Sequence, residues 1–216
     1  GLALEINTTP VLFTDYASFD KHVVGVLGSL KKTLPSGWNF LIKPSVEFSK
    51  EVIDAAPPEA LELGCEPDYN AWQEGLANPR PDASTNLRTG AGHLHIGWDK
   101  DIPVDHPDHI AVCCDFVKTL DLYVGLASII IDPDPTRRTL YGKAGCFRPK
   151  SYGVEYRTPS NAWLKTQTAR SFIFNCLTNA INAQLKNGRA RYDYDTYITQ
   201  VVGNKAKDYK NQFNIE

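Results

Sequence analysis

The sequence contains no methionine, no C-x-x-C pair and no apolar run long enough to cross a membrane. The absence of such a run argues against an integral membrane protein, and no signal-peptide pattern is recognisable. Its five cysteines are an odd number without metal-binding spacing, so they indicate neither a disulfide framework nor a zinc knuckle. We therefore expect a soluble, intracellular protein with reduced thiols and no membrane partner.

An excess of charge of either sign is also missing. The chain has 23 basic and 25 acidic residues in 216, a net charge of −2. No global basic field exists to hold nucleic acid, so nucleic acid is not an expected partner. Any phosphate chemistry must depend on a local cluster of cations. The length allows one large domain or two small ones with a substantial core.

The chain begins at Gly1 directly in the segment "GLALEIN", where Leu2, Leu4 and Ile6 alternate with smaller or polar residues. This alternation predicts a half-buried strand. A start inside a strand, without methionine, leads us to expect that an upstream segment was removed or lies in another chain.

Elsewhere the pattern mixes helices and strands without regular alternation, which predicts an α+β fold with a largely antiparallel sheet. Apolar spacing predicts helices over residues 15–34 and 108–126, and a long helix capped by Ser160 that ends near Gly188. Extended or strand patterns cover 38–49, 93–98 and 152–158. Proline, aspartate and asparagine mark loops at 54–60, 78–86 and 132–138.

Several charged side chains share the polar faces of these strands. His93 and His95 lie on one face of "GHLHIGW", opposite Leu94 and Ile96, because side chains alternate along a strand. Glu155 and Arg157 share a face in "GVEYRT", and Glu5 is on the polar face of the first strand. Each pattern alone is compatible with a solvated face or an ion pair. Three such strands together favour a site.

Carboxylate and imidazole ligands without a suitably spaced cysteine favour Mg²⁺ or Mn²⁺ over structural zinc. Cations recur along the same part of the chain: Arg88, Arg137, Arg138, Lys143, Arg148, Lys150 and Arg157. The guanidinium groups of the arginines suit phosphate or carboxylate. We interpret Lys150 as a solvated loop residue. "GKAG" is not a phosphate-binding loop, because the GxxxxGK[ST] spacing is absent. Acidic metal ligands with several arginines suggest phosphoryl transfer.

Four segments in this order, "LALEINTTP", "LGCEPDYNAW", "LRTGAGHLHIGW" and "RRTLYGKAGCFRPKSYGVEYRTPSNAWL", resemble the phage-encoded carboxylate–amine ligases (amidoligases, COOH-NH2 ligase type 2) of the glutamine synthetase and glutamate–cysteine ligase superfamily. The resemblance extends from residue 2 to about residue 165. It implies a half-barrel of antiparallel strands with helices on its outer face and catalysis on the concave face. It also implies a reaction in which ATP phosphorylates a carboxylate and an amine attacks the acyl phosphate.

The resemblance also implies roles for individual residues. Metal ligands would be Glu5, His93 and Glu155. ATP would contact His93, His95, Arg138 and Lys143, and the transferring phosphate or the substrate carboxylate would contact Arg138, Arg148 and Arg157. Asp68 and Asn70 in "EPDYN" are similar to the family without an assigned role. The ligase domain would span residues 1–186, followed by a polar arm or helix over 187–216.

One family feature is missing, an acidic strand of G-x-[DE]-P-E type upstream of "ALE". We therefore expect a complementary fragment or a second copy of the chain to complete the metal site. Two other functions stay open: a non-catalytic, processed virion component that keeps the fold, and a metal-dependent hydrolase. The expected location is the cytoplasm of the infected host or the virion. The carboxylate and amine, whether amino acid or peptide, are not revealed.

Overall fold

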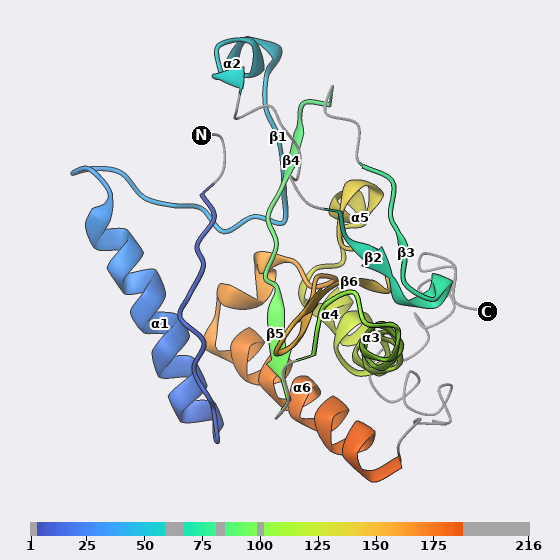
Figure 1. Ribbon diagram of the computed structural model, residues 1–216. Helices are drawn as coiled ribbons and strands as arrows, with labels where there is room; N and C mark the ends of the chain where they lie inside the picture. The colour runs from blue at the N-terminus through green and yellow to red at the C-terminus, as the bar shows by residue number, and fades with distance from the viewer. Residues whose placement is uncertain (1–3, 59–66, 81–84, 99–101, 188–216) are drawn as a thin grey trace.

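The computed structural model describes residues 4–58, 67–80, 85–98 and 102–187 (Figure 1). The fold is α+β, and every strand pair in these ranges is antiparallel, which confirms the predicted class. The strands are β1 (Ser45–Glu47), β2 (Tyr69–Asn70), β3 (Leu76–Ala77), β4 (Leu87–Thr89), β5 (Leu94–Gly97), β6 (Cys146–Lys150) and β7 (Gly153–Tyr156). The predicted arm over 187–216 lies almost wholly outside the described residues.

Longer and shorter helices surround the strands. The α-helices are α1 (Tyr16–Thr33), α2 (Lys50–Asp54), α3 (Pro107–Leu120), α4 (Leu126–Ile131), α5 (Thr136–Leu140) and α6 (Gln167–Asn187). A π-helix, η3 (Asp121–Gly125), joins α3 to α4. The described ranges also contain two 3₁₀-helices, η2 (Ala71–Gln73) and η4 (Asn161–Leu164).

The main sheet has the strand order β3-β2-β6-β7-β5 and is open, and β1 pairs with β4 in a separate ribbon. In the main sheet, β7 lies between β6 and β5. The register places His95, Glu155 and Arg148 side by side across these three strands. Closure of such a sheet into a half-barrel remains a prediction.

One face of the sheet packs on helix α3, and α3 and α4 pack in turn on α6; the three helices lie together beside the sheet in Figure 1. Phe147, Val154 and Tyr156 are fully buried from this face, together with helix residues such as Val117 and Ile173. Because side chains alternate along β6 and β7, the residues between them must point to the opposite face. The opposite face therefore carries Arg148 and Glu155.

Helix α1 is positioned by its aromatic residues. Asp15 caps its first turn by accepting a hydrogen bond from the Ser18 amide at 2.8 Å. Phe19 stacks on Trp163 with ring centroids 5.8 Å apart and contacts Phe174 of α6. The predicted helix over 15–34 is thus confirmed, and its buried side lies against α6 (Figure 1).

The predicted first strand is wrong for its described residues 4–7, which have no strand partner. Leu4 and Ile6 are 59% and 42% exposed, and Glu5 is also exposed. An alternating sequence forms a strand only when a neighbour completes its backbone hydrogen bonds. Among the described strands none pairs with this segment.

Three helix boundaries also differ from the prediction. The helix expected over 108–126 continues to Ile131, because the π-helix η3 connects α3 to α4 without an interruption. The loop expected at 132–138 contains the start of α5, where Asp134 accepts a hydrogen bond from the Thr136 amide. Ser160 caps the short η4 rather than the long helix, which begins only at Gln167.

Candidate active site

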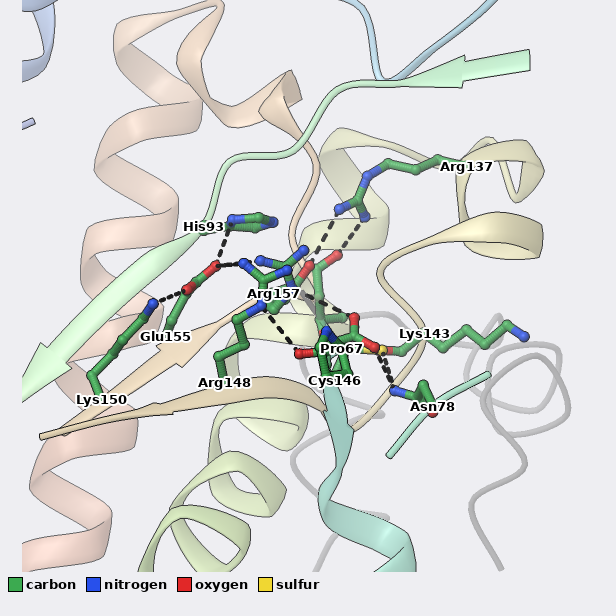
Figure 2. Close-up of polar contacts among 12 residues, drawn as sticks. Pro67, Asn78, His93, Arg137, Lys143, Cys146, Arg148, Lys150, Glu155 and Arg157 are labelled. Atoms are coloured by element: carbon green, nitrogen blue, oxygen red, sulfur yellow. Dashed lines mark hydrogen bonds and ion pairs between the residues drawn. The ribbon is translucent and has the colours of Figure 1, made fainter. Parts of the chain in front are cut away.

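Glu155 is the centre of a polar cluster on the face of the sheet opposite the core. Its side chain is 5% exposed, and its carboxylate oxygens contact side chains from three segments (Figure 2). Oε1 lies 3.1 Å from His93 Nδ1 and accepts a short hydrogen bond from Arg157. Oε2 lies 3.0 Å from Lys150 Nζ, and Arg148 Nη1 is 3.9 Å from Oε1. The cluster is therefore one buried carboxylate surrounded by three cations and an imidazole.

These partners decide the charge of Glu155. Burial alone would raise the pKa of its carboxyl, but the hydrogen bond from His93 and the charge of Arg157 hold that pKa well below its usual range. Burial lowers the pKa of His93, although Glu155 opposes this effect. At pH 7 the pair is thus a carboxylate and a neutral imidazole. Since Glu155 can only accept, His93 carries its proton on Nδ1 and leaves Nε2 as an acceptor.

Arg157 joins Glu155 to a second carboxylate. Its Nε lies 3.4 Å from Asp68 Oδ2, an ion pair without hydrogen-bond geometry. The backbone at Arg157 is held in place by Arg137, which donates hydrogen bonds to the carbonyls of Thr158 at 2.7 Å and Arg157 at 3.2 Å. Burial lowers the pKa of Arg137 to about 10, which leaves the guanidinium charged at neutral pH. Arg137 therefore supports the cluster structurally and does not face a ligand.

The small residues before His93 have a packing role. Gly92 lies against Trp163, whose Nε1 donates to the Gly92 carbonyl at 3.0 Å. A Cβ at position 92 would come within 2.2 Å of that Nε1 and 2.7 Å of the Ser160 carbonyl oxygen. Ala91 forms an isolated bridge with Ser160. Close contact with the segment after β7 thus places His93 over Glu155.

The structure brings only some of the predicted site residues together. His93, Arg148, Glu155 and Arg157 are in direct contact or adjacent in this cluster. His95 is on the same sheet face, but its Nδ1 lies 2.6 Å from the Tyr152 hydroxyl, and burial lowers its pKa. The interpretation of Lys150 as a solvated residue is wrong, because it sits on β6 and pairs with the buried Glu155.

The remaining predicted residues lie apart from Glu155. Arg138 donates to the Asp132 carbonyl at 3.3 Å. Lys143 is exposed, and its side chain extends away from Arg157 in Figure 2. Glu5 lies on the exposed N-terminal segment. Their predicted roles toward ATP, phosphate or metal are not tested by this arrangement.

Two comparisons with known proteins returned nothing: no curated protein and no solved structure matches the chain. A third comparison gave a match over residues 90–199 to the model of a family described as Phage phiEco32-like COOH.NH2 ligase-type 2. This match covers more than half of the chain, and it includes His93, Arg148, Glu155 and Arg157. The chain belongs to this family of carboxylate–amine ligases. The predicted family is confirmed, and a ligase that takes a carboxylate and an amine is the activity it suggests.

The sequence did not single out Asp121 as part of this ligase fold. Its carboxylate is buried in the π-helix η3 and accepts hydrogen bonds from Trp72 Nε1 at 2.7 Å, the Gly145 amide at 2.6 Å and the Tyr156 hydroxyl at 2.6 Å. Burial raises its pKa to about 6, although these hydrogen bonds oppose the rise. Asp121 thus ties β7 and the turn before β6 to the helix layer. An acidic residue inside an apolar helical pattern was its only sequence signal.

The described residues alone do not assemble the metal site expected for the family's chemistry. Among residues 4–58, 67–80, 85–98 and 102–187, no group of three or more His, Cys, Asp or Glu side chains is placed to hold a metal ion. Both oxygens of Glu155 are already in contact with cations, so a divalent ion there would face Arg157 and Lys150 at close range. The donor set as arranged does not fit Mg²⁺ or Mn²⁺. A shared role of Glu5, His93 and Glu155 as ligands remains a prediction.

Two other observations bear on the ligase as a whole. No helix in the described part of the chain is both long and apolar enough to span a membrane. Cys113, Cys114, Cys146 and Cys176 are buried free thiols. Cys65 lies outside the described residues.

Proposed function

We propose that the chain is a phage-encoded, ATP-dependent ligase that joins a carboxylate to an amine through an acyl-phosphate intermediate. The observation that carries the proposal is the excess of cations around one carboxylate. Arg148, Lys150 and Arg157 surround Glu155, and Arg157 also contacts Asp68. Three positive charges against two negative ones leave a positive surplus in a site of low dielectric, which suits an incoming phosphate or carboxylate.

Exposure suggests which of these groups meet the substrates. The side chains of Arg148, Lys150 and His93 are 18%, 29% and 22% exposed, whereas those of Glu155 and Arg157 are 5% and 9% exposed. We therefore assign Arg148 and Lys150 to contact with the transferring phosphoryl group. Glu155 holds them in place, and Arg157 adds its charge from beneath. His93 Nε2 accepts a hydrogen bond from a substrate hydroxyl or amine.

The reaction would use these groups in order. A carboxylate oxygen attacks the γ-phosphorus of ATP, the bond to ADP breaks, and charge accumulates on the transferring oxygens. Fixed cations stabilise this charge without reorganisation. The amine then attacks the carbonyl carbon and phosphate leaves. The predicted Mg²⁺ or Mn²⁺ would arrive with the nucleotide, and no step assigned to this chain passes through it. A half-barrel, with this cluster on its concave face, is part of the same proposal.

A hydroxamate assay tests the proposed function without knowledge of the natural amine. The chain is incubated with ATP, hydroxylamine and single carboxylates from a panel of amino acids and short peptides. We expect hydroxamate with at least one carboxylate, only when ATP is present. Arg148→Gln should reduce the rate about 10²- to 10³-fold. The matched control, Lys50→Gln on the exposed α2, should leave it unchanged. Hydroxamate formed without ATP, or none with any carboxylate, would contradict the proposal.

A further inference from the structure

A small cavity adjoins the cluster on the side of Arg157. It has a volume of about 40 Å³ and is lined by Asp68, Asn78, Leu140, Tyr141 and Cys146, among others. A water molecule needs roughly 10–15 Å³ of such space, so the cavity accommodates roughly three water-sized groups. It can therefore take the end of a substrate and not a whole nucleotide.

The polar wall of the cavity presents an acceptor. Asp68 Oδ1 accepts a hydrogen bond from Asn78 Nδ2 at 3.0 Å, and Asp68 Oδ2 faces Arg157 Nε at 3.4 Å without hydrogen-bond geometry. Each oxygen of a carboxylate can accept two hydrogen bonds, so these contacts, among the described residues, leave acceptor capacity on Asp68. Asn78 already directs its donor at Asp68, with Cys146 Sγ 3.5 Å from the same nitrogen.

Apart from Lys143, the residues that line the cavity carry no positive charge. Burial raises the pKa of the Cys146 thiol to about 12, so it is uncharged at neutral pH. Lys143 also lines the cavity, but it is exposed and its side chain extends away from Arg157 in Figure 2. Leu140 and Tyr141 supply apolar wall. An acceptor at one end and apolar wall beside it match an ammonium group on a short, unbranched carbon chain.

We propose that this cavity binds the amino group of the amine substrate, with Asp68 as its anchor. The inference rests on the proposed ligase function and adds to it the position and class of the second substrate, a primary amine on an unbranched carbon. Asp68 contacts Arg157, and Arg157 contacts Glu155. The side chain of Arg157 therefore separates the bound nitrogen from the cluster around Glu155, where the substrate carboxylate is activated.

Asp68 also accounts for the protons that the amine loses when it attacks the acyl phosphate. A bound ammonium group passes one proton to Asp68 and becomes a nucleophilic amine. The nitrogen then forms a bond to the carbonyl carbon, and the carbon–oxygen bond to phosphate breaks. The second proton leaves with the phosphate as hydrogen phosphate, and Asp68 returns its proton to solvent.

Binding is tested directly by nuclear magnetic resonance, with n-butylammonium and butyrate as probes of equal length and opposite charge. The reporter is the side-chain amide of Asn78 in the full chain. We expect butylammonium to shift this resonance saturably, butyrate to leave it in place, and Asp68→Asn to abolish the shift. Asp54→Asn on α2 is the control that should retain it. If Asp68→Asn does not fold, Asp68→Ser replaces it. A shift with butyrate alone, or with neither probe, would overturn the proposal.

Measurements of turnover distinguish the role of Asp68 in amine binding from the ligase function itself. In Asp68→Asn, half-saturation by butylamine should rise at least about tenfold, and the amine-dependent reaction should fall by a larger factor than the ADP formation that depends on the carboxylate but not on the amine. Equal loss of both reactions would mean that Asp68 acts only through Arg157, and the anchor would be rejected. If the wild-type chain forms no ADP with any carboxylate, the proposed function fails, and the resonance experiment still decides the cavity.

Discussion

Arg157 donates a hydrogen bond to Glu155, two residues earlier in the sequence, on the polar face at the end of β7. The contact is possible because alternation in a strand directs residues i and i+2 to one side. Both side chains are almost completely buried, so neither charge is solvated by water. The pair therefore depends on its neighbours, and those neighbours form the positively charged site.

Replacement of Glu155 by Gln should destabilise the fold. The change leaves Arg157 and Lys150 without their buried counter-charge, and such a loss typically costs about 3–5 kcal/mol of unfolding free energy. Glu74→Gln is the matched control, because Glu74 pairs with Lys118 at 3.0 Å but its side chain is 83% exposed. Its effect should stay below about 1 kcal/mol. Urea denaturation at pH 7 measures both, and equal effects would argue against a buried network.

The difference in unfolding free energy between the wild type and Glu155→Gln should also depend on pH. Because the folded state lowers the pKa of Glu155 from its ordinary 4.5, its stabilising contribution is complete above pH 4.5 and is lost as the pH falls below that value. The difference in unfolding free energy between the wild type and Glu155→Gln should therefore shrink in acid. A constant difference from pH 7 to pH 3 would contradict the assigned ion pairs.

Asp121 should show the opposite dependence. Its folded-state pKa of about 6 exceeds the ordinary 3.8, so the buried charge costs stability above pH 6, and the cost disappears as the pH falls below 4. The free energy of unfolding of the wild type, relative to Asp121→Asn, should fall by about 2 kcal/mol from pH 4 to pH 7. Glu155 is present in both proteins, so its contribution to the pH dependence cancels in the difference. Parallel curves from urea denaturation across this range would show that Asp121 does not titrate as described.

Gly142→Ala should displace Arg137, whose hydrogen bonds hold the backbone at Arg157 and Thr158. Gly142 has a φ of +71°, and a Cβ there would come within 1.8 Å of Arg137 Nη1. The strained backbone and the displaced guanidinium should together cost at least about 3 kcal/mol. Gly28→Ala in α1 is the control, since no atom lies within 4 Å of its added Cβ, and it should stabilise the helix by about 0.5–1 kcal/mol. Thermal unfolding distinguishes the two, and a stable Gly142→Ala protein would contradict the packing around Arg137.

The sequence predicted the faces of the central strands correctly. Alternation alone placed Glu155 with Arg157, and Leu94 opposite His93 and His95, because a period of two is a local property of a strand. It could not show which strands are neighbours. The contact between Lys150 and Glu155, and the nearness of Asp68 to Arg157, depend on the pairing of β6 with β7 and β2.

The errors have the same origin. The segment that contains Glu5 alternates like a strand, but alternation supplies no partner for its backbone groups. The local pattern also could not separate the environments of the adjacent Arg137 and Arg138, although the role predicted for Arg138 stays a prediction. The start of α5 turns Arg137 into a buried support and directs Arg138 to the Asp132 carbonyl. The Asp121 network joins residues up to 49 positions apart, which no local pattern reveals.

Transfer of oxygen tests the central claim most directly. A carboxylate that supports hydroxamate formation is labelled with oxygen-18 in its carboxyl group and incubated with the chain, ATP and hydroxylamine. An acyl phosphate breaks at the carbon–oxygen bond, so one labelled oxygen per turnover should appear in inorganic phosphate, as phosphorus resonance or mass spectrometry would detect. Product formed with unlabelled phosphate would show that the carboxylate is not phosphorylated and would contradict the mechanism proposed for this cluster.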